Sequence, residues 1–335
     1  MCTMLGAPQG PRLLMEGAGL YTLRYTQRDH VVPAQRPADR GSPATAGGAP
    51  PAPPPAELRI RQLRSHEEFA ACVALQHETW GADFSERVPA AILKVSQRIG
   101  GVTAGAFDAQ ERLVGFVFGM TGVENGRLVH WSDMLAVRPE LRNRGIGRRL
   151  KEFQRDTLLG RGVGVIYWTF DPLVARNAHL NLNRLGVQVA EYVIDMYGSD
   201  TDSALHRGLG TDRFVVAWRI AEPARSVRRA AGASPTPPAT RTARVLNASA
   251  GDGVPAIPRL PDGPAEATLR VEIPLEIDRV QEASLTLAGR WRAATRAALT
   301  WGLENGYRVD GFYRDDQAAR GYYVLSRSAP SAGAG

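Results

Sequence analysis

The sequence predicts a mixed α/β fold, in which a partly parallel sheet is flanked by helices. Three observations predict it. Between residues 57 and 220, strand-like and helix-like runs follow one another in the order β-α-α-β-β-β-α-β-α-β-β, and two of the helices come late and cross over between strands. A second block at 268–328 reads strand, long helix, strand, strand, which predicts a small α/β extension. Hydrophobic residues make up 44% of the chain, which is ample for a core.

Each element follows from its hydrophobic period and its flanking residues. The run "ELRIRQLR" alternates as a strand, and Ser65 with Glu68 forms a capping box that begins the first helix. Pro89 begins the second helix. The remaining strands are predicted at "GVTAGAFD", "RLVGFVFGMTG", "RLVHWSDMLAV", "VGVIYWTF", "VQVAEYVIDMYG" and "RFVVAWRI", and the remaining helices after Gly147 and at "VARNAHLNLNRLG".

Two segments rich in proline, alanine, glycine and arginine, 1–56 and 221–267, are predicted to be disordered. They have too few apolar side chains to offset the entropy of ordering. They leave a core domain at 57–220 and an extension at 268–328. Because so short a block makes a marginal core, we expect the extension to dock on the core domain. There it either completes an acceptor cleft or forms the contact of a homodimer.

Composition limits the class of protein. The chain opens without the charged start and apolar run of a signal peptide, and no apolar stretch is long enough to span a membrane. Cys2 and Cys72 form neither a disulfide framework nor a metal-ligand spacing, so we expect a cytoplasmic protein with no metal. The net charge is +7, and the basic residues are almost all arginines, with Lys94 and Lys151 as the only lysines. This bias is typical of GC-rich coding, and we therefore do not expect a nucleic acid as partner.

The stretch "RPELRNRGIGRRL" places Gly145 and Gly147 among arginines, directly before an amphipathic helix. Small residues let the backbone turn so that several N–H groups at the helix start point at one position, and the helix dipole adds positive potential there. A pyrophosphate is the natural occupant. A dinucleotide-binding fingerprint is excluded because Leu150 stands at its third glycine position, and a P-loop is excluded because Arg148-Arg149 replaces Lys-Ser/Thr.

Leu135-Ala136-Val137 followed by Arg142-x-x-Gly145-x-Gly147 resembles the acyl-CoA-binding motif of the GNAT superfamily of N-acyltransferases, and the resemblance covers roughly 57–220. The run "TFDPLVARNAHLNLNRLGV" is similar to that of a predicted bacterial subgroup with a C-terminal extension. The resemblance implies a GNAT-type sheet, in which the strand ending at Val137 separates from the next strand and the pantetheine arm lies between them. It also implies acetyl-CoA or another acyl-CoA as cosubstrate. The residues implied to bind this cosubstrate are Leu135, Ala136, Val137, Arg142, Asn143, Arg144, Gly145, Ile146, Gly147, Arg148 and Asn177.

The resemblance places the catalytic base on the strand before the loop, where it implies Asp133. Asp133 is predicted to share a strand face with Leu135 and Val137, because alternate residues of a strand point the same way. A structural partner for an arginine is its alternative role. His130, on the opposite face, is predicted to be a core or rim histidine. Asp171 is predicted either to reach the acceptor amine or to cap a helix.

Many relatives carry a tyrosine that protonates the departing thiolate, and Leu182 stands at that position here. Tyr192 or Tyr197 is the candidate replacement, or no acid is needed, since a thiol pKa of about 8.5 makes the thiolate a tolerable leaving group. Arg292 and Arg296 lie four residues apart on the long helix of the extension. They are either a solvated edge or a clamp for a carboxylate of the acceptor or of the acyl group.

The leading functional prediction is an N-acyltransferase. It would move an acetyl or other short acyl group from acyl-CoA to the amine of a small molecule by direct attack, and an amino acid is one candidate acceptor. The alternative is a non-catalytic protein that binds or senses acyl-CoA. The missing tyrosine favours this alternative, while the intact loop and Asp133 disfavour it.

Overall fold

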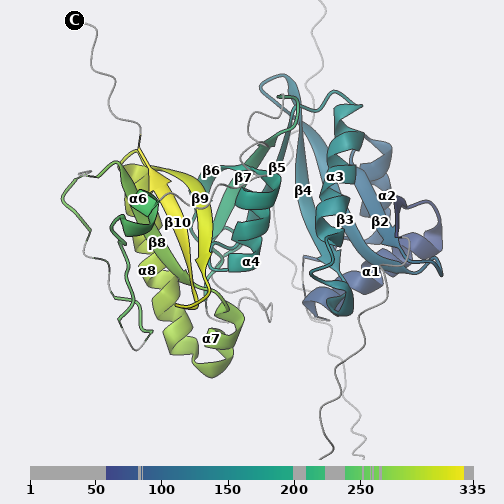
Figure 1. The fold of residues 1–335 in the computed structure, drawn as a ribbon. Helices are drawn as coiled ribbons and strands as arrows, with labels where there is room; N and C mark the ends of the chain where they lie inside the picture. Colours follow the sequence, from purple (N-terminus) through teal and green to yellow (C-terminus); the bar gives the residue numbers. More distant parts are fainter. Residues whose placement is uncertain are drawn as a thin grey trace, which may run out of the picture. The chain divides into compact units, whose positions relative to one another are not determined.

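The structure is a computed structural model. It describes residues 58–81, 84, 86–198, 209–222, 238–250, 253–256, 258, 260–263 and 266–327. The segment 1–56, predicted to be disordered, lies outside these residues. The described residues form a seven-stranded sheet in the order β1-β2-β3-β4-β5-β7-β6 and a three-stranded sheet in the order β8-β10-β9 (Figure 1). The pair β4–β5 is parallel and the other strand pairs of the described residues are antiparallel, so the prediction of a mixed, partly parallel sheet is confirmed.

The core domain contains the elements of the larger sheet and its helices. They are β1 (Arg59–Gln62), α1 (His66–Trp80), α2 (Ala90–Arg98), β2 (Val102–Phe107), β3 (Leu113–Glu124), β4 (Arg127–Val137), a 3₁₀ turn at Pro139–Leu141, α3 (Ile146–Leu159), β5 (Val165–Phe170), α4 (Ala175–Ala178), a π-helical segment at His179–Leu185, β6 (Gln188–Val193) and β7 (Arg213–Arg219). The smaller sheet belongs to a second set: α6 (Pro238–Thr242), β8 (Thr268–Pro274), α7 (Ile277–Ala283), α8 (Leu285–Glu304), β9 (Arg308–Asp315) and β10 (Arg320–Ser326).

Helices cover both faces of the larger sheet. Alternate residues of β3 belong to two hydrophobic clusters, as expected for a strand buried on both sides. Val117 packs in the cluster of α3, whereas Phe116 and Phe118 pack with α1. The predicted capping box is confirmed, because the hydroxyl of Ser65 accepts a hydrogen bond from the Glu68 amide at 3.3 Å.

The strand β4 contains a β-bulge that the sequence did not predict. Phe118 of β3 pairs with Met134 and Gly119 pairs with Ser132, so Asp133 is an extra residue without a partner on β3. The extra residue interrupts the alternation of faces. Beyond the bulge, Leu135 and Val137 pack against the same hydrophobic cluster as α3, and the prediction that Asp133 shares their face stays a prediction.

Part of the segment 221–267, predicted to be a disordered linker, is structured in the described residues. Residues 238–250 contain α6 and then run beside β8, where Val245 forms a parallel bridge with Arg270. The buried Asn247 side chain donates to the Glu272 carbonyl at 2.9 Å and accepts from the Glu272 amide at 2.7 Å. One amide side chain thus satisfies backbone groups of β8, which the composition of the segment does not reveal.

The extension packs directly on the core domain. Tyr323 of β10 donates a hydrogen bond to the Pro172 carbonyl at 2.7 Å, and its ring lies 5.4 Å from that of Phe214 on β7. The Asn183 amide also donates to the Phe312 carbonyl of β9, at 2.8 Å. One hydrophobic cluster includes residues of both sheets.

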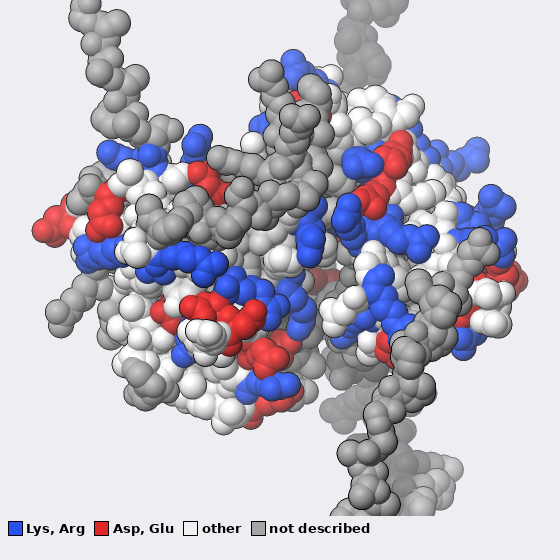
Figure 2. Space-filling model, in the orientation of Figure 1, with Lys and Arg blue, Asp and Glu red and all other residues white. Residues whose placement is uncertain are grey.

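Surface charge is mixed. Figure 2 shows arginine and lysine side chains interspersed with aspartate and glutamate on the face in view, so the net charge of +7 does not form one continuous basic surface there. No helix within the described ranges is long and apolar enough to cross a membrane.

Candidate active site

The strands β4 and β5 pair over a short distance and then separate. Their parallel register joins Val129 to Val165 and ends where Trp131 meets Tyr167. Beyond this point β4 continues beside β3 and β5 continues beside β7. We call the place where the two strands part, after Trp131 and Tyr167, the fork. Among the described residues, the β5-facing edge of β4 has no ladder partner past the fork, which leaves backbone groups there for a ligand.

The glycine loop follows the end of β4 and begins α3. Asn143 and Gly145 both adopt left-handed backbone conformations, with φ of 62° and 76°. The first helical hydrogen bond runs from the Arg149 amide to the Gly145 carbonyl at 3.1 Å. The amides of residues 146–148 therefore have no acceptor inside the helix. They form a row of N–H groups at its positive end, as an anion site requires.

The side chains of the glycine loop leave the space in front of the amides of residues 146–148 open. Residues 142–145 are exposed, while Ile146 is buried and anchors the helix on the sheet. A Cβ placed on Gly147 would meet only the Leu135 side chain, at 3.7 Å, so the first helical turn has free space beside it. Arg142 donates from Nε to the Val137 carbonyl at 3.1 Å, and Arg148 pairs with Glu152 at 2.8 Å. The loop fits a phosphate-bearing group through its backbone, with arginines at its rim.

Asp133 lies at the bulge, close to the fork. It follows Trp131, the last residue of β4 that pairs with β5, by two positions. The residue is solvent-accessible. Even so, partial burial of the carboxylate raises its pKa above the usual range, against an opposing hydrogen bond from the Trp131 side chain. A carboxylate with a raised pKa is a stronger base, which suits proton removal.

The two candidate tyrosines have different surroundings. The Tyr197 hydroxyl lies 3.0 Å from the Thr169 hydroxyl, near the end of β5 past the fork. The Tyr192 hydroxyl donates to Asp212 at 2.5 Å, and burial together with this bond raises the pKa of Tyr192. Tyr192 is therefore part of a buried network, whereas Tyr197 is exposed.

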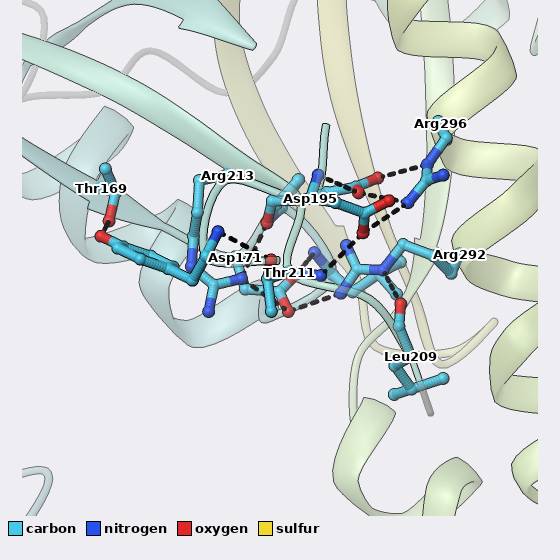
Figure 3. Close-up of polar contacts among 12 residues, drawn as sticks. Thr169, Asp171, Asp195, Leu209, Thr211, Arg213, Arg292 and Arg296 are labelled. Atoms are coloured by element: carbon cyan, nitrogen blue, oxygen red, sulfur yellow. Dashed lines mark hydrogen bonds and ion pairs between the residues drawn. The ribbon is translucent and has the colours of Figure 1, made fainter. Parts of the chain in front are cut away.

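The two arginines of α8 bind carboxylates of the core domain (Figure 3). Arg292 donates from Nη2 to Asp171 at 2.6 Å and from Nε to the Leu209 carbonyl at 2.9 Å. Arg296 binds both oxygens of Asp212, at 2.9 and 2.5 Å, and Asp195 at 3.0 Å. The interpretation of these arginines as a solvated edge is wrong for Arg292, which is 5% exposed.

Three further residues that the sequence singled out are Asp171, His130 and Asn177. Asp171 accepts from the Leu173 amide at 2.8 Å, in a turn that precedes α4. The N-cap of α4 is Val174, which makes no side-chain cap bond, so the prediction that Asp171 caps a helix is wrong. His130 is fully buried and lies 3.0 Å from both Thr121 and Gln154, so its prediction as a core histidine is confirmed. Burial lowers the pKa of His130 to about 3, with help from the charges of Lys151 and Arg161. Asn177 is half-buried on α4.

Several solved structures match about half of the chain. The ribosomal-protein-S18-alanine N-acetyltransferase from Escherichia coli is 19% identical, with a TM-score of 0.39, over 50% of this chain and 97% of its own. Naa50 of Arabidopsis thaliana, in complex with the bisubstrate analogue CoA-Ac-MVNAL, is 16% identical, with a TM-score of 0.38, over 48% of this chain and 97% of its own. An aminoglycoside 6'-N-acetyltransferase complexed with coenzyme A is 15% identical, with a TM-score of 0.37, over 49% of this chain and 98% of its own.

No protein-family model matches the sequence, and no curated protein matches it. Among the described residues, the mixed sheet, the parallel pair β4–β5 and the glycine loop at the start of α3 agree with the resemblance.

Proposed function

We propose that this protein is an acyl-CoA-dependent N-acyltransferase that acts on the amine of a small molecule, with an amino acid as one candidate acceptor. The observation that carries the proposal is the position of the glycine loop. The acceptor-free amides of residues 146–148 begin only nine positions after Val137, the end of the strand that departs from β5. A site for a pyrophosphate thus lies next to an unpaired strand edge.

Each residue has a role in this proposal. The amides of residues 146–148 bind the pyrophosphate, with Arg142, Asn143, Arg144 and Arg148 around it. The edge of β4 at 135–137 binds the pantetheine arm, and Asn177 is a further contact. Acyl-CoA supplies the activated thioester. A backbone N–H of β4 stabilises negative charge on the carbonyl oxygen.

Proton transfer is assigned to two side chains. Asp133 takes a proton from the acceptor amine, directly or through a water molecule, because the amine is protonated at neutral pH and must lose a proton before attack. Tyr197 is the better candidate for protonating the thiolate, since Tyr192 is committed to Asp212. The thiolate can also leave without an acid, given a thiol pKa of about 8.5.

A second function is favoured by one observation. Leu182 occupies the position of the usual acid, and the Tyr192 hydroxyl is held by a carboxylate. A protein that binds acyl-CoA without turning it over would have no need for either tyrosine. The two functions share the loop and differ in the role of Asp133.

Release of CoA thiol separates the two functions. The full-length chain would be incubated with acetyl-CoA or succinyl-CoA and a panel of amines, including amino acids. We expect amine-dependent thiol release, reduced about 100-fold or more by Asp133→Asn, as for loss of a general base. Asp156→Asn is the matched control, because Asp156 is an exposed carboxylate on α3. Saturable acyl-CoA binding with no thiol release from any amine would favour the sensor instead.

A further inference from the structure

We infer that Lys151 is a positioning residue that joins β4 to β5 at the fork and so holds the bulge that carries Asp133. The role of Asp133 in this inference rests on the proposed function. Lys151 lies on α3, a little more than one turn after the glycine loop, and is 3% exposed. It has no part in the roles assigned above, yet its amine lies at the place where the two strands part.

The contacts of the amine define this position. Lys151 Nζ donates to the Ser132 hydroxyl on β4 at 2.7 Å. The same Nζ lies 3.8 Å from the centre of the Trp168 ring on β5, a cation–π distance. Ser132 follows Trp131 and Trp168 follows Tyr167, so each is the first residue of its strand beyond the last parallel pair. One amine therefore contacts both strands immediately past the fork.

Ser132 transmits this contact to Asp133. Ser132 is the residue directly before the bulge, and its backbone pairs with Gly119 of β3. That pair is close, because a Cβ on Gly119 would approach the Ser132 Cα to 2.9 Å and the Trp131 carbonyl to 2.4 Å. Ser132 is thus held on one side by β3 and on the other by Lys151. Loss of the amine would leave the bulge supported from one side only.

The amine of Lys151 is buried at a cost in free energy. No carboxylate of the described residues lies within ion-pair distance of Lys151. The polar groups on the packed elements are Ser132 and His130 of β4 and Gln154 of α3, and the charge of Arg161 acts on His130. Burial lowers the pKa of Lys151 to about 7. A buried amine without an anionic partner costs free energy that an apolar side chain would not. Its contacts with both strands offset that cost.

Hydrogen exchange measured on the full-length chain tests the inference without relying on catalysis. The variants are Lys151→Met, which keeps the length and packing of the side chain, and Leu158→Ala, which weakens the packing of the same helix away from the fork. Ser132→Ala removes the same hydrogen bond from the other side. In Lys151→Met and Ser132→Ala we expect amides of 131–136 and 167–170 to exchange about tenfold faster, as for loss of one hydrogen bond. The exchange rates of amides in β8, β9 and β10 should be the same as in the wild type.

Two results of the exchange experiment would overturn the inference. In the first, the exchange rates of the fork amides are the same in Lys151→Met as in the wild type. In the second, they rise only together with those of the rest of the chain, as in Leu158→Ala. Turnover adds the second readout: Lys151→Met should lower kcat about tenfold with the KM for acyl-CoA unchanged, because a displaced base slows the chemical step. A loosened fork with unchanged kcat would overturn the positioning of Asp133. If the wild-type chain releases no thiol, the proposed function fails, and the exchange data still decide whether Lys151 joins the strands.

Discussion

Gly145 and Gly147 serve the loop in different ways. Gly145 has a φ of 76°, where a Cβ is strained, while Gly147 does not adopt a positive φ and has space for a methyl group. We expect Gly147→Ala to change the free energy of unfolding by less than about 1 kcal/mol, because alanine is at least as good a helix former. The same methyl group would project beside the free amides and should weaken CoA binding about tenfold or more.

Calorimetric titration with CoA and urea unfolding of Gly147→Ala check this prediction. Gly289→Ala on α8 is the matched control, because it adds a methyl group to a helix where nothing lies within 4 Å. Equal CoA affinity in both variants would show that the first turn of α3 does not hold the phosphates.

The pH dependence of turnover reports on Asp133. Partial burial raises its pKa, and the base must be deprotonated to act. Activity should therefore fall as the pH falls through this raised pKa, at a higher pH than for an ordinary carboxylate of about 3.9. A profile of kcat/KM against pH, compared between wild type and Asp133→Asn, provides the measurement. An acid limb that persists unchanged in Asp133→Asn must belong to another group.

Lys151 links stability to pH. Its pKa is about 7 in the folded chain and about 10.4 when unfolded, so the unfolded chain binds more protons between these values. Relative to Lys151→Met, the wild type should gain about 1.4 kcal/mol of stability per pH unit as the pH rises through this window. Urea unfolding at pH 7 and pH 9.5 measures the difference. Lys94→Met, on the exposed face of α2, is the control. A stability difference between wild type and Lys151→Met that does not change with pH would contradict the assignment.

At the scale of elements, α8 binds a carboxylate just after β6, Asp195, and another just before β7, Asp212. Burial alone raises the pKa of Asp212, but hydrogen bonds from Arg296 and Tyr192 outweigh it and keep that pKa below its usual range. We expect Arg296→Met to destabilise the fold by about 3 kcal/mol, because it leaves a buried carboxylate without its cation. The destabilisation should have its full size above a pH of about 4, the pKa of aspartate in the unfolded chain. It should shrink as the pH falls through the lower pKa that Asp212 has in the folded chain.

Thermal or urea unfolding at pH 7 and pH 3 measures this effect. Arg290→Met is the control, since Arg290 lies on the exposed side of the same helix. A destabilisation that does not change with pH would show that Arg296 acts through packing rather than through Asp212.

Local signals in the sequence predicted most helices and strands. The features that they did not predict depend on contacts between residues far apart in the chain. The capping box at Ser65 and the glycines before α3 act within a few residues, so both could be read from the chain. The bulge at Asp133 arises from the register between β3 and β4, which no local period reveals. Likewise, Arg292 finds Asp171 from a position 121 residues away, and a spacing of four on a helix could not identify that partner.

The second crossover helix shows the same limit. The run after Val174 was predicted as one helix, but it begins as α4 and continues as a π-helical segment at His179–Leu185. In this segment the Asn181 side chain accepts from the Trp168 indole at 3.0 Å, and Asn183 binds β9. The partner of Asn183 belongs to the extension, 129 residues further along the chain, so no local pattern could identify it.

At the scale of the whole molecule, the core domain and the extension share one hydrophobic cluster. Phe214 of β7, Trp291 of α8 and Tyr323 of β10 are all buried in it. We therefore expect a single cooperative unfolding transition, with equal calorimetric and van't Hoff enthalpies. A chain ended after residue 222 would expose the Phe214 side of the cluster and should lose solubility or the native transition. Two separate transitions in the full chain would show that the extension folds independently.

The central claim is that the glycine loop holds an acyl-CoA. Calorimetric titration of the full-length chain with acetyl-CoA, at two temperatures and at low and high salt, tests it most directly. We expect saturable binding of one acetyl-CoA per chain, weaker at high salt because arginines surround the phosphates. A folded sample that gives no binding heat at either temperature would contradict both the proposed enzyme and the acyl-CoA sensor.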